Sequence, residues 1–331
     1  MRFAFPAVVL TLLAVIAESG LVRAQPSRPP YKVGLLTGNS CRAEDPSDVS
    51  GQVREALAKF GYVDGKNIAI ECRVAAGGPE ETRIPAQELI GLGMDVIIAH
   101  GTPPALAAQR ATKTTPVVMF NIADPVARGL VASLARPGAN VTGLANLAEG
   151  QTLKGFELLQ EGAPNVTRVA VFTDLANEAQ AALVAEQDAA ARIRGLKLQR
   201  VDVRSSSDLD AAFAAVLRER AQAIYIYPLR IPRNDVARVI DFAIKHRLPS
   251  MAAVSQAFLS AGVLFFHSHS LDEQYYRLGM YVDRVLKGVK PAELPVERPT
   301  KFDLIINLKT AQAIGLTVPE SLLVRADRVI K

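Results

Sequence analysis

The chain has 331 residues and a formal net charge of +5 at pH 7, with 49% hydrophobic and only 6% aromatic residues. Acidic and basic residues are interspersed, and no basic block or stripe of aromatic and basic residues is present to follow a phosphate backbone. Nucleic acid is therefore excluded as an expected partner. The length is sufficient for two domains of about 150 residues each.

The first 24 residues have the pattern of a signal peptide. Arg2 precedes an apolar run over residues 6–17, and the segment 21–24 ends in Ala24, a small residue that suits signal peptidase. A membrane anchor is the alternative, but this run has only about 12 residues, whereas a membrane-spanning helix needs about 20. We therefore expect cleavage after Ala24, export to a bacterial periplasm and no stable membrane insertion.

The first half of the mature sequence alternates strand and helix patterns. Runs rich in Val and Ile, such as Val96-Ile97-Ile98-Ala99, are typical of strands buried on both faces. Two of the helix patterns stop at Gly61 and Gly93. The predicted strands are 33–36, 68–73, 96–99, 117–120 and 141–144, and the predicted helices are 48–60, 80–92 and 105–111. This order predicts one α/β lobe with a parallel sheet.

The second half repeats this order without repeating the sequence. Its predicted strands are 169–172, 198–203, 223–227, 250–253, 263–266 and 302–306, and its predicted helices are 178–193, 208–220, 234–246, 272–287 and 310–314. The segment 291–299 contains prolines and cannot be a regular helix. The tail is too short for a third domain, so we expect it to return elements to both lobes through a hinge near residues 143–150, 267–270 and 296–300. The expected lobes are 25–145 plus about 268–298, and 146–267 plus about 299–331.

Two cysteines fit an oxidising compartment. Cys41 follows the first predicted strand and Cys72 lies within the second. Consecutive strands of such a sheet are usually neighbours, so a disulfide is geometrically reasonable. The alternative is two unpaired, partly buried thiols. Neither cysteine has the spacing of a metal site.

Polar residues follow several predicted strands, and the carboxyl ends of parallel strands form the ligand crevice in such sheets. Thr102 stands before two prolines, so its hydroxyl and the neighbouring N–H groups are candidates to hold a carboxylate; a plain helix cap is the alternative. Asp124 is the candidate partner of an ammonium, with a turn cap at Pro125 or a pair with Arg128 as alternatives. The candidate ligand-binding residues are Asn39, Ser40, His100, Gly101, Thr102, Asn121, Asp124, Thr173, Asp174, Tyr227 and Ser255.

Two of these candidates have an aromatic ring. Tyr227 ends a predicted strand and is a candidate to stack on a planar ligand, or else it packs at the rim beside Pro228. His100 is a candidate to face the cleft, and its alternative is a ring satisfied by backbone groups. The polar candidates Asn39, Ser40 and Asn121 organise turns as often as they bind ligands. The set as a whole predicts recognition without reaction.

Several loop motifs occur in a characteristic order. They are GYVDGKNI at 61–68, GTP at 101–103, DPV at 124–126, GLVASLARPG at 129–138, NVTG at 140–143, PTKF at 299–302, INLKTA at 306–311 and GLTVP at 315–319. In these motifs the chain resembles the ABC transporter substrate-binding proteins of the tryptophan-binding TrpX type. The resemblance covers nearly all of the mature sequence.

The resemblance implies a type I periplasmic binding protein fold, with two Rossmann-like lobes of parallel sheet, connecting segments that form a hinge, and a cleft that closes on a small-molecule solute. It also implies a membrane permease and a cytoplasmic ATPase as partners, neither of which lies on this chain. The expected ligand is an amino acid, with an aromatic one as first candidate, or a related organic acid. We expect a monomer without a cofactor or a metal.

Two other classes of protein were weighed against this one. An enzyme is disfavoured because the sequence has no phosphate loop, no Gly-x-Ser-x-Gly elbow and only four histidines, of which His267 and His269 form an incomplete metal motif. A periplasmic sensor has the same fold and presents its closed form to a receptor. A repressor needs an N-terminal DNA-binding motif where this chain has a signal peptide.

Overall fold

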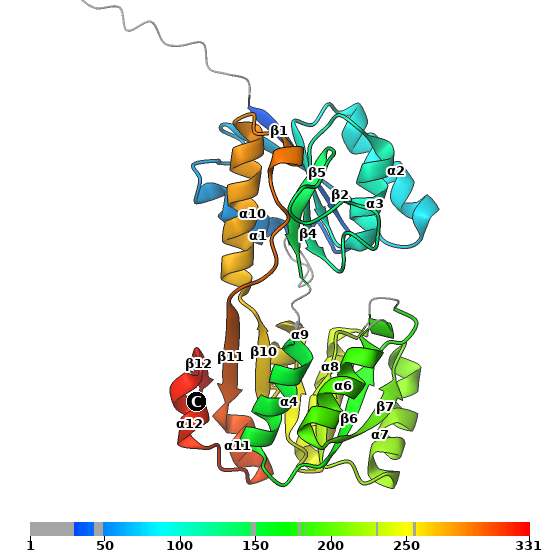
Figure 1. The fold of residues 1–331 in the computed structure, drawn as a ribbon, viewed down its shortest axis with the longest axis vertical. Helices are drawn as coiled ribbons and strands as arrows, with labels where there is room; N and C mark the ends of the chain where they lie inside the picture. Colours follow the sequence, from blue (N-terminus) through cyan, green and yellow to red (C-terminus); the bar gives the residue numbers. More distant parts are fainter. Residues whose placement is uncertain are drawn as a thin grey trace, which may run out of the picture.

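A computed structural model describes residues 30–42, 49–146, 150–177, 180–181, 183–229, 231–253 and 256–331. These residues form two α/β lobes, one above the other in Figure 1. The predicted signal peptide and its cleavage site lie outside the described residues. Within the described ranges, no helix is long and apolar enough to cross a membrane.

The first lobe has a five-stranded sheet in the order β2-β1-β3-β4-β5, and each of its pairings is parallel. Its central strands are fully buried because helices cover both faces: α1 and α10 pack on one side, and α2 and α3 on the other. The elements of this lobe are β1 (Tyr31–Thr37), α1 (Ser50–Ala58), β2 (Ile68–Val74), α2 (Pro79–Gly91), β3 (Val96–His100), α3 (Thr102–Ala111), β4 (Val117–Ile122), β5 (Val141–Ala145), α10 (Leu271–Leu286) and the 3₁₀ turn η2 (Pro291–Glu293).

The second lobe has a seven-stranded sheet in the order β12-β11-β10-β9-β8-β6-β7. Its pairings are parallel except that of β10 with β11. Helices α4, α6, α11 and α12 cover one face, and α7, α8 and α9 cover the other. The elements are α4 (Gln151–Gly162), β6 (Arg168–Thr173), α6 (Val184–Arg194), β7 (Lys197–Asp202), η1 (Ser206–Asp208), α7 (Leu209–Arg218), β8 (Ala223–Ile226), α8 (Arg233–Lys245), β9 (Ser250–Ala252), α9 (Gln256–Ser260), β10 (Phe265–His269), β11 (Phe302–Asn307), α11 (Leu308–Ile314), α12 (Glu320–Arg325) and β12 (Arg328–Ile330).

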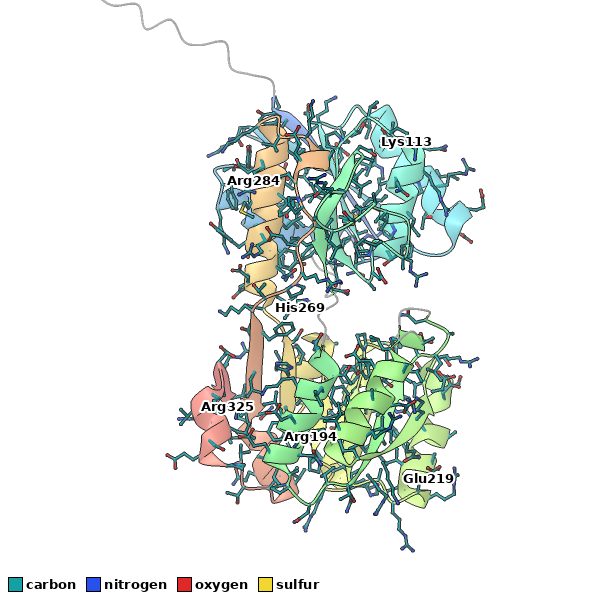
Figure 2. The ribbon with its side chains drawn as sticks, in the orientation of Figure 1. Lys113, Arg194, Glu219, His269, Arg284 and Arg325 are labelled. Atoms are coloured by element: carbon teal, nitrogen blue, oxygen red, sulfur yellow. A yellow bond between two sulfur atoms is a disulfide. The ribbon has the colours of Figure 1, made fainter. Side chains whose placement is uncertain are left out.

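The chain passes from the first lobe to the second after β5, returns between β10 and α10, and passes back before β11. Two of these connections are tied together, because the Ser270 N–H donates to the Lys301 carbonyl over 3.0 Å. Figure 2 places His269 at this junction, where the strands of the second lobe meet α10 of the first. The two lobes are therefore linked by adjacent segments from distant parts of the sequence, an arrangement suited to hinge motion.

The predicted disulfide is confirmed. Cys72 lies on β2 in register with Leu35 of β1, and Cys41 follows β1, so the two sulfur atoms come together with a Cα–Cα distance of 6.0 Å. The bridge attaches the segment after β1 to the edge strand of the sheet.

Several predicted boundaries differ from the structure. The strand predicted to end at residue 266 extends to His269, so that much of the expected hinge segment 267–270 is strand. Helix α3 begins at Thr102 because prolines are tolerated in a first helical turn. The short elements α9, α12 and β12 were not predicted, since three to six residues are too few to establish a hydrophobic period.

Two of the four histidines, His267 and His269, are buried and His100 is half-buried, which predicts sensitivity to acid. Burial lowers the pKa of His100, His267 and His269 to about 4, against 6.5 for an exposed imidazole. Between these two values the unfolded chain binds more protons than the folded chain, so stability is complete above pH 6.5 and falls as the pH drops towards 4. Relative to neutral pH, we expect the free energy of unfolding at pH 4.5 to be lower by roughly 2 to 3 kcal/mol for each of these histidines.

Urea unfolding of native protein and His269→Phe at pH 7 and 4.5 measures this loss. The fall in the free energy of unfolding from pH 7 to pH 4.5 should be smaller in the variant than in native protein. The difference between the two falls is the contribution of His269. Equal losses in both proteins would show that His269 does not titrate between them.

Candidate ligand-binding cleft

Two connected cavities lie between the lobes, beside the carboxyl ends of the parallel strands. One has a volume of about 300 Å³ and the other about 600 Å³. Both are lined by Asn121, Ala123 and Asn146 from the first lobe and by Asn177 from the second. Because they share these residues, the two cavities form one cleft to which both lobes contribute.

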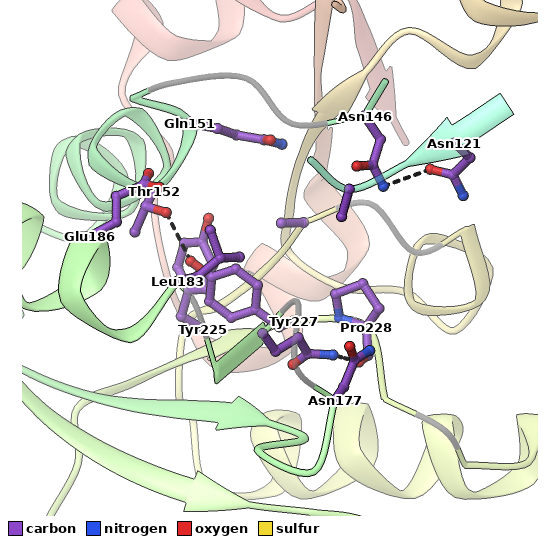
Figure 3. A pocket seen from close by; sticks show the side chains of 13 residues that line it. Asn121, Asn146, Gln151, Thr152, Asn177, Leu183, Glu186, Tyr225, Tyr227 and Pro228 are labelled. Atoms are coloured by element: carbon purple, nitrogen blue, oxygen red, sulfur yellow. Dashed lines mark hydrogen bonds between the residues drawn. The ribbon is translucent and has the colours of Figure 1, made fainter. Parts of the chain in front are cut away.

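The smaller cavity, here called the tyrosine cavity, extends into the second lobe (Figure 3). Tyr225 lies on β8 and Tyr227 follows it, with ring centroids 5.2 Å apart. Burial raises the pKa of Tyr227 to about 12 and that of Tyr225 well above its usual value, so both phenols are neutral. The cavity therefore has aromatic walls. The full lining is Asn121, Ala123, Asn146, Gln151, Thr152, Asn177, Gln180, Leu183, Glu186, Tyr225, Tyr227, Pro228 and Ala253.

Hydrogen bonds fix several of these side chains. The hydroxyls of Thr152 and Tyr227 are 3.0 Å apart, and Asn146 Nδ2 donates to Asn121 Oδ1 over 2.8 Å. Gln180 accepts from the Thr173 hydroxyl over 2.8 Å and donates to the carbonyl of Pro228 over 2.6 Å. Hydrogen-bonded side chains lose little additional conformational entropy when a ligand binds, so this part of the cleft is preorganised.

The larger cavity, here called the arginine cavity, lies against the first lobe. Thr102 from the start of α3 lines it, as do Arg110 and Arg128. Of the described residues that line it, these two arginines are the charged ones. Gly101 precedes the helix with φ +94°, a conformation that suits glycine. A hydroxyl, a helix start and two cations favour an anionic group in this cavity.

Three of the predicted site residues, Thr102, Asn121 and Tyr227, line the cleft. Thr173 and Asp174 do not line the cleft but support a residue that does. Both are buried, and the Thr173 hydroxyl and the Asp174 backbone N–H donate to the side-chain Oε1 of Gln180. Ser255 lies outside the described residues.

The remaining candidates make local contacts in the structure. The Asp124 carboxylate accepts from the N–H of Ala127 over 3.0 Å, which is the turn-capping alternative, and it does not line either cavity. His100 Nδ1 is 3.3 Å from the Thr37 hydroxyl, and the N–H of Asn39 donates to the same hydroxyl. Ser40 accepts from the N–H of Arg42 over 3.1 Å. A ligand contact by any of these residues stays a prediction.

Sequence reasoning missed most of the second-lobe lining. Gln151 and Thr152 begin α4, and Leu183 and Glu186 come from the start of α6. These residues do not follow a strand, so the strand-end rule could not find them. The one available signal was Gly150, which marks the start of α4 with φ +77° and places two polar residues beside the hinge.

A two-lobed α/β fold with a hinge and an interlobe cleft defines a solute-binding protein of the type I periplasmic class. Residues 45–330 match the family model described as ABC transporter substrate binding protein, and the chain belongs to this family. This is a family of substrate-binding proteins rather than of enzymes, and its members deliver a small-molecule solute to a transporter.

Relatives of known structure or function support this assignment. The chain is 27% identical to the tyrosine-binding protein of Clostridioides difficile (strain R20291) over 79% of its own length and 75% of the relative's. It is 27% identical to the ABC domain in complex with L-Trp from Streptococcus pneumonia, with a TM-score of 0.78 over 91% of this chain and 100% of the other. The ligand-free, open structure of an adhesive substrate-binding protein from Clostridium difficile is 25% identical, with a TM-score of 0.71 over 91% of this chain and 99% of that one.

Proposed function

We propose that this protein binds an amino acid with an aromatic side chain in the interlobe cleft and delivers it, in the periplasm, to a membrane permease driven by a cytoplasmic ATPase. The observation that carries the proposal is the division of charge and shape along the cleft. The arginine cavity has cationic lining, whereas the tyrosine cavity has aromatic walls and Glu186 as its charged lining residue among those described. An amino acid carboxylate suits the first cavity and a planar side chain suits the second.

The size of the cleft supports the same ligand class. The tyrosine cavity of about 300 Å³ is at the small end of the range for small-molecule pockets and is large enough for one aromatic ring. Asn121, Asn146 and Asn177 line both cavities, and we propose that their side-chain amides bind the amino group of such a ligand. Two relatives, the tyrosine-binding protein and the domain in complex with L-Trp, have ligands of this class.

Binding is proposed to act through hinge closure. A ligand that contacts Thr102 in the first lobe and Tyr227 in the second makes both sets of contacts only when the lobes are close together. Its binding free energy therefore favours the closed form over the open form. The transporter then distinguishes loaded protein from empty protein by shape.

Removal of the Thr102 hydroxyl tests the proposed carboxylate site. Thr102→Ala is expected to weaken binding of the preferred aromatic amino acid roughly tenfold, because one hydrogen bond to a charged group is lost. Thr102→Ser keeps the hydroxyl and is the matched control, with affinity close to native. Isothermal titration calorimetry with tyrosine, tryptophan, phenylalanine, leucine and glucose measures which class of ligand binds. It also measures how far Thr102→Ala lowers the affinity.

The same titration decides the role of Asp124. Asp124→Asn removes the charge but keeps a side-chain oxygen for the turn and tolerates its φ of +41°. Native affinity in this variant is the expected result, and a loss as large as that of Thr102→Ala would assign the ammonium contact to Asp124. Binding of glucose or leucine in preference to every aromatic amino acid would reject the proposed ligand class.

A further inference from the structure

The inner end of the tyrosine cavity contains polar groups that lack partners. Among the described residues, Gln151 Nε2 is buried without a hydrogen-bond partner, and the Tyr225 hydroxyl makes no hydrogen bond although the residue is only 1% exposed. Glu186, which is half-buried, makes no ion pair within the same residues. Most buried polar groups in folded proteins are satisfied, so a group of unsatisfied ones lining a cavity indicates a ligand that satisfies them.

All three residues line the tyrosine cavity, Gln151 from α4, Glu186 from α6 and Tyr225 from β8. In Figure 3, Gln151 points into the cavity from the start of α4, and Glu186 lies beside Thr152 on the tyrosine side. The negative charge of Glu186 contributes to the raised pKa values of Tyr225 and Tyr227, as expected for a carboxylate near both phenols. The Tyr225 and Tyr227 rings thus form walls of the cavity, and the Glu186 carboxylate lies near enough to act on both hydroxyls.

The position of the Tyr225 hydroxyl is fixed by packing. A Cβ atom added at Gly155 of α4 would lie 2.3 Å from the Tyr225 hydroxyl oxygen, so this helix approaches the phenol as closely as a glycine permits. The neighbouring Tyr227 hydroxyl is already bonded to Thr152. The Tyr225 side chain, which lines the cavity, is therefore held in place by α4 and cannot rotate away.

The chemistry of the three groups selects a particular kind of ligand end. A carboxylate accepts only, an amide N–H donates only, and a phenol does either. A hydroxyl on an aromatic ring both donates and accepts, so it suits a cavity that offers an acceptor in Glu186 and donors in Gln151 and Tyr225. A purely apolar ring would leave the carboxylate desolvated and unpaired, and a second carboxylate would be repelled.

We propose that Glu186, with Gln151 and Tyr225, is a specificity-determining group that selects ligands with a hydrogen-bond-donating hydroxyl at the far end of the aromatic ring. The inference rests on the proposed function, since it assumes that an aromatic side chain enters the tyrosine cavity. Sites built to bond a substrate hydroxyl discriminate strongly against the analogue that lacks it.

Calorimetric titration of tyrosine and phenylalanine tests the inference, because the two ligands differ only in the hydroxyl. Native protein is expected to bind tyrosine at least 100-fold more tightly than phenylalanine. Glu186→Gln should reduce this ratio to below tenfold, chiefly through weaker tyrosine binding. Gln151→Met should reduce the ratio in the same direction by a smaller factor. Melting curves without ligand establish that each variant is folded.

Glu161→Gln is the matched control, because Glu161 lies at the far end of α4, where it pairs with Arg325 and lines neither cavity. It should leave the ratio of tyrosine to phenylalanine affinity unchanged.

Equal affinity of native protein for tyrosine and phenylalanine would overturn the inference while leaving the proposed function intact. A Glu186→Gln variant that weakens both ligands equally would also overturn it, since the carboxylate would then meet the ammonium that both share. Failure of every aromatic amino acid to bind, with another solute bound, would reject the proposed function and this inference together.

Discussion

Replacing Gly143 by alanine is expected to destabilise the first lobe by about 4 kcal/mol or more, the largest effect of any substitution considered for this chain. Gly143 has φ +133°, and a Cβ atom at this position would lie 2.0 Å from the carbonyl oxygen and 2.7 Å from the amide nitrogen of Met119. Both obstacles are backbone atoms of β4, so no side chain can rotate to relieve the clash. The strand itself must move.

The location of Gly143 increases the effect. Its carbonyl accepts from the N–H of Glu297 over 3.1 Å, and the N–H of Ala145 donates to the Glu297 carbonyl over 2.9 Å. Gly143 therefore holds β4, β5 and the segment that leads towards β11 in one place, next to the connections between the lobes. Displacing it breaks pairings on two sides at once.

Thermal unfolding followed by circular dichroism measures the effect, and a fall of roughly 10 °C in the melting temperature is expected. Gly91→Ala is the control. It makes the same chemical change at the end of α2, where an added Cβ meets nothing within 4 Å and φ is not in the left-handed region. The control should melt at the native temperature or slightly above it. A native melting temperature for Gly143→Ala would show that β4 and β5 separate more easily than their close approach indicates.

The second large effect concerns the disulfide. Exchange of both cysteines for serine, Cys41→Ser with Cys72→Ser, is expected to lower the free energy of unfolding by about 3 to 4 kcal/mol, because the bridge closes a loop with a sequence separation of 31. Neither cysteine lines the cleft, so ligand affinity should stay close to native in the folded variant. This variant is thus expected to be less stable than native protein but to bind the ligand equally well.

Urea unfolding of native protein, of the double variant and of native protein in reducing agent measures the contribution. The reduced native protein should resemble the double variant, since both lack the crosslink. If the double variant and the reduced protein both unfold at the same urea concentration as native protein, the disulfide contributes no net stability. The segment after β1 would then stay close to β2 in the unfolded chain even without the bridge.

The fold was largely predictable because its signal is local. Runs such as Val96 to Ile98 are fully buried in β3, as continuous apolar runs require in a parallel sheet covered on both faces. Several helix ends were marked by glycines, and chain order alone placed Cys41, which follows β1, close to Cys72 on the neighbouring strand β2. The strand predicted to end at residue 266 is longer because it pairs with β11 as far as His269, with His267 and His269 buried in it, and a local pattern does not show this pairing.

The candidate site was predictable only in part. Thr102, Asn121 and Tyr227 were found because they follow strands, and strand ends meet at one edge of a parallel sheet. Asp124 also follows a strand, but its left-handed backbone turns the carboxylate towards Ala127 instead of the cavities. No pattern of residue types distinguishes these two outcomes.

The sequence by itself determined the α/β class and the two-lobe order of elements, since these follow from periodicity and stop signals. It made the disulfide geometrically reasonable, and the structure decided for the bridge over two unpaired thiols. Only the tertiary structure decided which side chains share the cleft. Gln151, Glu186 and Tyr225 come from a helix start, another helix and a strand, and they line one cavity only because α4, α6 and β8 pack together. Such convergence depends on packing distances between elements, which residue order does not encode locally. The polar end of the tyrosine cavity therefore appears only once the second lobe is folded.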